Sequence, residues 1–116
     1  MPENRMYPRY RIIVDIKIHL NKKEIMAAAF NISQGGIRFV TNKKIEMNSV
    51  CTIEFVDAKG ISLVRGGQIV FIEAVYKHPD MQKYGFQFAV PLSASDLMSI
   101  RKKLGVPEKD KDQPLT

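Results

Sequence analysis

Residues 11–20 are the most regular stretch of the chain, because apolar side chains occupy every second position. One side of the alternating pattern is entirely aliphatic and consists of Ile12, Val14, Ile16, Ile18 and Leu20. Successive side chains of a β-strand point to opposite faces, so a period of two predicts a long strand with one buried face. Such a strand requires neighbours of the same kind, and the rest of the sequence supplies them.

Further apolar or alternating runs are separated by polar turns, and they predict strands at 25–30, 37–40, 51–56, 61–75 and 84–90. Gly66 and Gly67 interrupt the long run, which predicts a bulge or sharp bend, and His78-Pro79-Asp80 predicts a loop. Ser93-Ala94-Ser95-Asp96 has the form of a capping box that opens one helix, with Gly105 just after its end. Six or seven antiparallel strands and one helix predict a mainly all-β protein, a small closed or nearly closed barrel.

The 116 residues favour one domain, with a flexible arm at 1–9, the barrel and its closing helix at 10–104, and a polar tail at 105–116. Hydrophobic residues make up 45% of the chain, a globular composition. We see no run long enough to cross a bilayer and no leader, and Cys51 stands alone. We therefore expect a cytoplasmic protein without membrane insertion.

The formal net charge of +6 is concentrated near the start of the chain. Residues 1–23 hold six cationic and two acidic side chains, a net +4, whereas the other 93 residues hold twelve and ten, a net +2. This distribution suggests an anionic partner that docks on the arm and the first strand. The alternative is a solvated face that keeps the protein soluble.

Catalysis has little support in the sequence. His19 and His78 are the only histidines, and no Cys, His or carboxylate cluster has metal-ligand spacing. Cys51 falls on an apolar strand face and is expected to be a core residue. We predict a protein that is not an enzyme, with no catalytic residue, no metal site and no cofactor.

Two arginines lie four residues apart on the arm, Arg5 and Arg9, and Pro8 between them restricts the backbone. A guanidinium carries a rigid fork of donors that can bind a phosphate or the O6 and N7 atoms of guanine. Arg-x-x-x-Arg is nevertheless common in basic proteins.

A polar, glycine-rich turn follows the second predicted strand and contains Asn31, Ser33 and Gly36. The amide and hydroxyl groups can donate or accept hydrogen bonds, Gly36 permits close backbone approach, and turn N–H groups can form an anion-binding nest. The alternative is a tight strand connection, where the same residue types are common.

The two motifs together resemble the PilZ domain, a bacterial receptor module for cyclic di-GMP. The family carries Arg-x-x-x-Arg before its first barrel strand and Asp/Asn-x-Ser-x-x-Gly after its second, which Arg5, Arg9, Asn31, Ser33 and Gly36 match. The resemblance covers roughly residues 4–104 and includes the late strand around Tyr84-Gly85-Phe86-Gln87-Phe88. It implies a six-stranded antiparallel PilZ-type β-barrel with a C-terminal α-helix, whose arm folds over the ligand and whose five motif residues bind cyclic di-GMP.

Two departures from the family pattern concern the ligand. Asn4 stands where many members have another arginine, which leaves open whether one or two dinucleotides bind. The chain has no Trp, so Tyr7 and Tyr10 are the candidates for stacking on the ligand.

The resemblance implies a cyclic di-GMP receptor or adaptor that changes its surface on binding and regulates a protein partner in motility, secretion or exopolysaccharide machinery. One alternative is a basic barrel that binds single-stranded nucleic acid. Nucleic acid is a disfavoured partner because four phenylalanines are expected in the core, which leaves no exposed aromatic platform for stacking bases. They are Phe39, Phe55, Phe86 and Phe88. A second alternative is a PilZ-like interaction module without a ligand.

Overall fold

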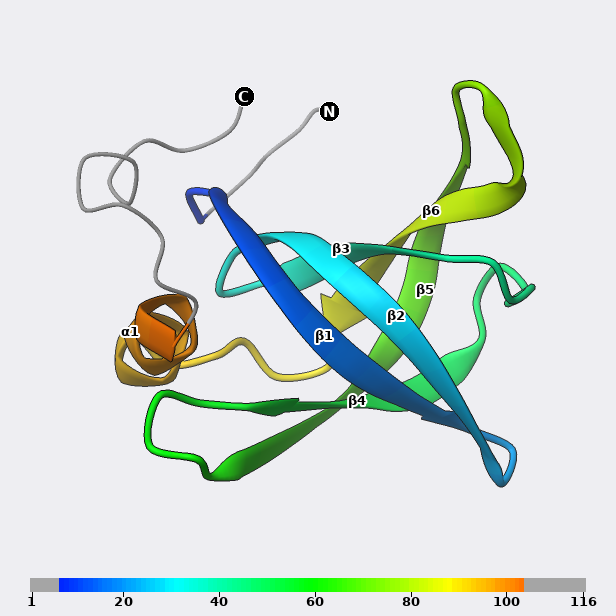
Figure 1. The fold of residues 1–116 in the computed structure, drawn as a ribbon. Coiled ribbons are helices and arrows are strands. Elements are labelled where there is room, and N and C mark those ends of the chain that lie inside the picture. The colour runs from blue at the N-terminus through cyan, green and yellow to red at the C-terminus, as the bar shows by residue number, and fades with distance from the viewer. Residues whose placement is uncertain (1–6, 104–116) are drawn as a thin grey trace.

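The computed structural model describes residues 7–103, which form six strands and one helix. The elements are β1 (Tyr10–Leu20), β2 (Lys23–Ile32), β3 (Gly36–Thr41), β4 (Val50–Val56), β5 (Ser62–Val75), β6 (His78–Phe88) and α1 (Ala94–Lys103). All neighbouring strands are antiparallel, and the sheet closes on itself in the order β1-β2-β3-β6-β5-β4 (Figure 1). The predicted closed barrel with a C-terminal helix is confirmed.

The interior of the barrel is filled by the side chains that the alternating pattern places inward. Four of the five aliphatic residues of β1 are buried, and Leu20 at the end of the strand is half-buried. The largest buried aromatic residues are Phe39, Phe55, Tyr84 and Phe86. Each such side chain contributes about 1.5–3 kcal/mol through burial, which explains why strands with one apolar face wrap around a common core.

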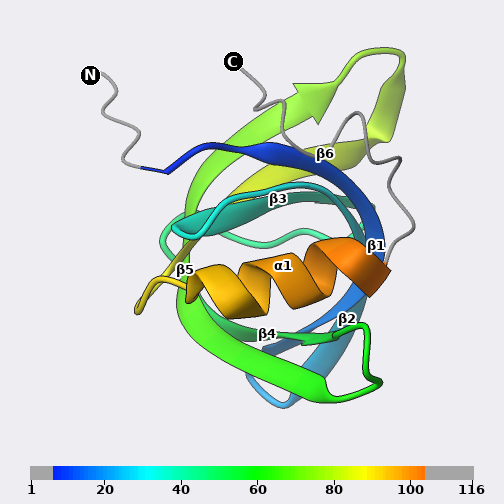
Figure 2. The ribbon, with the colours of Figure 1, turned by 90° about the vertical axis from the view of Figure 1, so that its left-hand side faces the viewer.

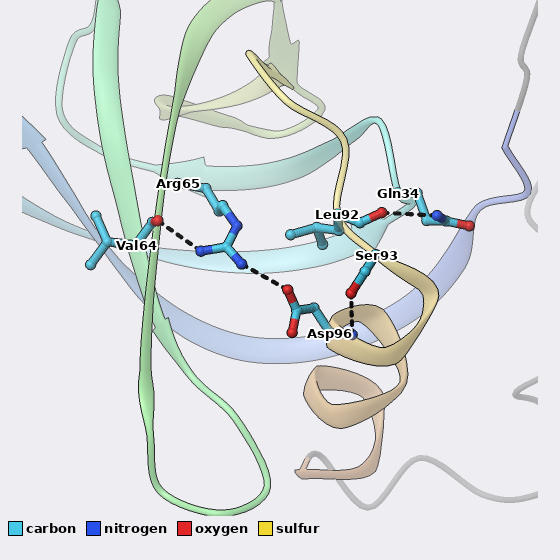
Figure 3. Close-up of polar contacts among 6 residues, drawn as sticks. All are labelled: Gln34, Val64, Arg65, Leu92, Ser93 and Asp96. Carbon is cyan, nitrogen blue, oxygen red and sulfur yellow. Dashed lines mark hydrogen bonds and ion pairs between the residues drawn. The ribbon is translucent and has the colours of Figure 1, made fainter.

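Helix α1 lies across one open end of the barrel, as Figure 2 shows. Its inward residues Leu97 and Ile100, together with Leu92 before it, are buried in the same core. Ser93 Oγ accepts a hydrogen bond of 3.0 Å from the backbone N–H of Asp96, the expected cap. The carboxylate of Asp96 instead accepts a 2.7 Å bond from Arg65 on β5, so only half of the predicted capping box forms (Figure 3).

Strand β5 differs from the sequence prediction, because Gly66 and Gly67 cause no bulge. Its pairing with β4 runs through both glycines without interruption. A side chain at position 67 would collide with the backbone oxygen of Gln87, so Gly67 permits the close approach of β6. The bulge lies three residues later, at Val70, where β5 has one residue more than the facing part of β6.

The β5–β6 hairpin also differs from the prediction. His78, Pro79 and Asp80 belong to β6 rather than to a loop, and the strands are joined by the tight turn Tyr76-Lys77, in which Lys77 has a φ of 66°. The last strand was predicted to run to residue 90 but ends at Phe88, and Val90 is 72% exposed. Within residues 7–103, no helix is long and apolar enough to cross a membrane.

Candidate ligand-binding site

The arm and the polar turn meet on the outside of the barrel through Arg9 and Asn31. The guanidinium Nη1 of Arg9 donates a 3.1 Å hydrogen bond to the side-chain oxygen of Asn31, near the end of β2. Asn31 is only 4% exposed, so its amide gives Arg9 a fixed attachment point. The structure therefore brings together one residue from each of the two motifs. Arg5 lies outside the described residues.

Ser33 organises the turn between β2 and β3. Its backbone N–H donates to the carbonyl oxygen of Gly36 at 2.9 Å, and its Oγ accepts bonds from the N–H groups of Gly35 and Gly36 at 3.1 and 3.2 Å. The sequence suggested that N–H groups of this turn form an anion-binding nest. The N–H groups of Gly35 and Gly36 do not contribute to one, because both donate to Ser33 Oγ. The hydroxyl hydrogen of Ser33 is the group that this turn can offer to a ligand.

Gly36 has a second role that the motif does not reveal. A side chain at this position would collide with the carbonyl oxygen of Phe86 on β6, which pairs with β3. The absence of a side chain is therefore required for strand packing, in addition to any approach by a ligand.

The two tyrosines proposed for stacking are in different places. Tyr7 packs over Gly35, since a Cβ added there would lie 3.2 Å from its ring, and it lines the pocket described below. Tyr10 lies under the guanidinium of Arg101 from α1, whose carbon is 3.7 Å from the ring centroid. Of the two, Tyr7 is in position to meet a ligand.

A pocket of about 350 Å³ opens between the arm, the turn and the outer face of the sheet. Tyr7 and Arg9 line it from the arm, and Ser33, Gly35 and Gly36 line it from the turn. The remaining wall comes from β3, β5 and β6 and includes Arg38, Val70, Phe71, Gly85 and Gln87. Asn31 is not among the lining residues and acts through Arg9. Pockets of this size are typical of small-molecule sites.

Sequence reasoning missed the wall formed by Arg38, Phe71 and Gln87. Arg38 was visible as the one charged residue in the predicted strand 37–40, but nothing in the sequence placed it near the arm. The two arginines make the lining cationic, and no Asp or Glu of residues 7–103 contributes to it. The pocket therefore suits an anionic ligand.

The groups considered for catalysis lie elsewhere. His19 is hydrogen-bonded to Glu54 at 3.0 Å on the barrel surface, and hydrogen bonds from His19 and Ser62 lower the pKa of this carboxyl. Cys51 is buried, and burial raises the pKa of its thiol, which disfavours the nucleophilic thiolate. No group of three His, Cys, Asp or Glu side chains suited to a metal ion occurs in the part of the chain that the structure describes.

Fold and pocket together define a small β-barrel with a cationic pocket on its outside. The sequence model of the PilZ domain family matches residues 3–104, and this chain belongs to that family.

Two solved structures share the fold. The PilZ domain with c-di-GMP of YcgR from Escherichia coli has a TM-score of 0.65 and 14% identity, with 88% of this chain and 89% of that chain covered. The Bacillus subtilis inhibitor of motility MotI/DgrA has a TM-score of 0.69 and 18% identity over 87% of this chain. The match covers 49% of that chain, so this protein spans about half of its length. No curated protein matches the sequence significantly.

Proposed function

We propose that this chain is a cytoplasmic cyclic di-GMP receptor that changes its surface on binding and thereby regulates a protein partner. The observation that carries the proposal is the pocket in which Arg9 of the first motif is bound to Asn31 of the second. Membership of the PilZ family supports this role, and so does the c-di-GMP in the structure of the YcgR domain.

The residues of the pocket have complementary tasks. The hydrogen bond to Asn31 restrains the Arg9 side chain, so less side-chain entropy is lost when its guanidinium binds a phosphate or a guanine edge. Ser33 donates its hydroxyl hydrogen from the turn. Arg5, four residues before Arg9, supplies a second guanidinium from the arm.

The output is a change of surface rather than a chemical reaction. When the arm closes over the dinucleotide, the arm and the exposed parts of the ligand form a surface that the empty protein does not have. A partner protein in motility, secretion or exopolysaccharide machinery binds one of the two surfaces preferentially. Bacillus subtilis MotI/DgrA, which is named an inhibitor of motility, is a relative in fold that fits such a role.

Isothermal titration with cyclic di-GMP tests the proposal. Arg5→Ala and Arg9→Ala each remove a charged hydrogen-bonding group, worth about 1.5–3 kcal/mol, and we expect about 10- to 150-fold weaker binding. Arg11→Ala is the matched control, because Arg11 is exposed, follows Arg9 by two residues and does not line the pocket. It should change affinity by no more than about threefold. The molar ratio decides between one and two bound dinucleotides.

Absence of both heat and thermal stabilisation with the parent protein would overturn the receptor proposal. A titration with oligothymidine at rising salt addresses the nucleic-acid alternative, since many phosphate contacts would give binding that weakens steeply with salt. The four core-facing phenylalanines are all buried, so none of them is available to stack on bases.

A further inference from the structure

The wall of the pocket that comes from β3, β5 and β6 contains a cation stacked on an aromatic ring. Arg38 on β3 pairs with Gly85 on β6, and Gly85 pairs in turn with Phe71 on β5. The guanidinium carbon of Arg38 lies 5.1 Å from the centroid of the Phe71 ring, within the range of a cation–π interaction. Both side chains line the pocket.

Two features of the backbone produce this pair. The bulge at Val70 adds one residue to β5, so Val70 and Phe71 do not alternate as they would in a regular strand, and both reach the outer pocket wall. Gly85 leaves the space between the partners empty, because a Cβ there would lie 2.9 Å from the Cβ of Phe71. Without the bulge and the glycine, Phe71 could not reach Arg38 across β6.

The pair lies outside the buried core, and none of the carboxylates in residues 7–103 forms an ion pair with it. Arg38 and Phe71 are half-buried on the outer face of the barrel. Among residues 7–103, Arg38 has the Phe71 ring as its contact and no carboxylate within ion-pairing distance. The ring restrains the long side chain, and a restrained guanidinium loses less entropy when it binds a further group.

We propose that Arg38, held on Phe71, is a further ligand-binding residue that reads the guanine base of the bound cyclic dinucleotide. The inference rests on the proposed function and adds a determinant of base specificity to it. A guanidinium fork donates to O6 and N7 of guanine, which both accept. Adenine has an amino group in place of O6, so the same fork meets a donor and loses one bond.

The test compares cyclic di-GMP with cyclic di-AMP in titrations of four proteins: the parent, Arg38→Ala, Arg38→Lys and the control Arg11→Ala. A bidentate contact to a base contributes about 1–3 kcal/mol of discrimination, so Arg38→Ala should reduce the preference for the guanine dinucleotide by about 5- to 150-fold. Arg38→Lys keeps the charge without the planar fork and should lose most of the same preference. Arg11→Ala should retain it.

Phe71→Leu separates the role of the ring from that of the charge. It keeps an apolar side chain beside Gly85 and should lower the preference in the same direction, to a smaller extent. Melting curves and circular dichroism of each variant report whether the barrel is intact, and Arg38 is half-buried, so both substitutions at this position are expected to fold.

The outcomes distinguish this inference from the proposed function. A parent that binds neither dinucleotide overturns both. A parent that binds cyclic di-GMP and loses affinity through Arg9→Ala, but keeps its base preference in both Arg38 variants, overturns the role of Arg38 alone. Equal weakening of both dinucleotides by Arg38→Ala, with no change in Arg38→Lys, would show that only the charge matters and would also overturn base recognition.

Discussion

Gly36 begins β3 at the point where this strand faces the backbone of β6. Its register partner is Gln87, and the carbonyl oxygen of the preceding residue, Phe86, occupies the space that a side chain would need. That oxygen belongs to the backbone of β6, which pairs with a strand on each side, so it cannot move without disturbing the β3–β6 ladder. The glycine of the second motif is therefore a requirement of the sheet as well as of the site.

Gly36→Ala should destabilise the barrel by about 1–3 kcal/mol, the usual cost of overpacking. For a domain of this size, we expect a fall in melting temperature of about 5–20 °C, measured by circular dichroism or scanning calorimetry. Gly66→Ala is the control on β5, because its added Cβ meets only a Thr52 methyl group at 3.9 Å. Equal melting temperatures for the parent and Gly36→Ala would contradict the packing role.

At the residue scale, the sequence predicts which side chains belong to the site better than it predicts their partners. Arg9, Asn31 and Ser33 are recognisable by their spacing, and the structure places all three around one pocket or behind it. The bond from Arg9 to Asn31 and the turn bonds to Ser33 depend on strand register, which spacing does not give. Phe71 reaches the pocket because of a bulge that has no signature in the sequence.

Helix α1 is connected to both halves of the candidate site. Gln34, inside the second motif, exchanges two hydrogen bonds of 2.8 Å with the backbone of Leu92, just before the helix (Figure 3 shows the side-chain bond). Arg101, in the last turn of the helix, lies over the ring of Tyr10, the residue after Arg9. A ligand that fixes Arg9 therefore also restrains the contact between Tyr10 and α1.

Saturation with cyclic di-GMP should slow amide hydrogen exchange in α1, because fixing the arm reduces local opening of the helix that packs on it. The turn between β1 and β2, at residues 21–22, serves as the internal reference and should not change. Arg101→Met retains an apolar contact with Tyr10 but removes the cation, and we expect it to bind the dinucleotide while losing most of the exchange response in α1. An unchanged exchange rate in α1 of the saturated parent would contradict this coupling.

At the element scale, the alternating pattern predicts strands well where one face is buried. Residues 27–29 are all alanine and have high helix propensity, yet they lie in β2 because Ala27 and Ala29 face the core between two strands. The errors concern exposed backbone. Pro79 was expected to lie in a loop, but it lies near the start of β6 in an exposed hairpin extension, where a missing N–H is tolerated.

At the scale of the whole molecule, the barrel closes along the seam between β1 and β4. This seam has three paired positions in register, whereas β1 and β2 have nine. Sequence patterns predict that the sheet edges must be closed. They do not reveal that β3 pairs with β6, because this pairing depends on how the complete core packs. Glu54 on β4 bonds across the short seam to His19 on β1 and also to Ser62 on β5.

The seam makes stability depend on pH through Glu54. Its hydrogen bonds, first from His19 and then from Ser62, lower the pKa of the folded carboxyl below its ordinary value of 4.5. A lowered folded pKa means that the unfolded chain takes up the proton first, so the stabilisation is present above the ordinary value and is lost as pH falls through the folded one. Urea unfolding between pH 7 and pH 3 should therefore show Glu54→Gln less stable than the parent at neutral pH and nearly equal to it in acid. The control Glu73→Gln, at an exposed position of β5, should follow the parent throughout. A constant difference in stability between Glu54→Gln and the parent at every pH would contradict the role of the Glu54 carboxylate.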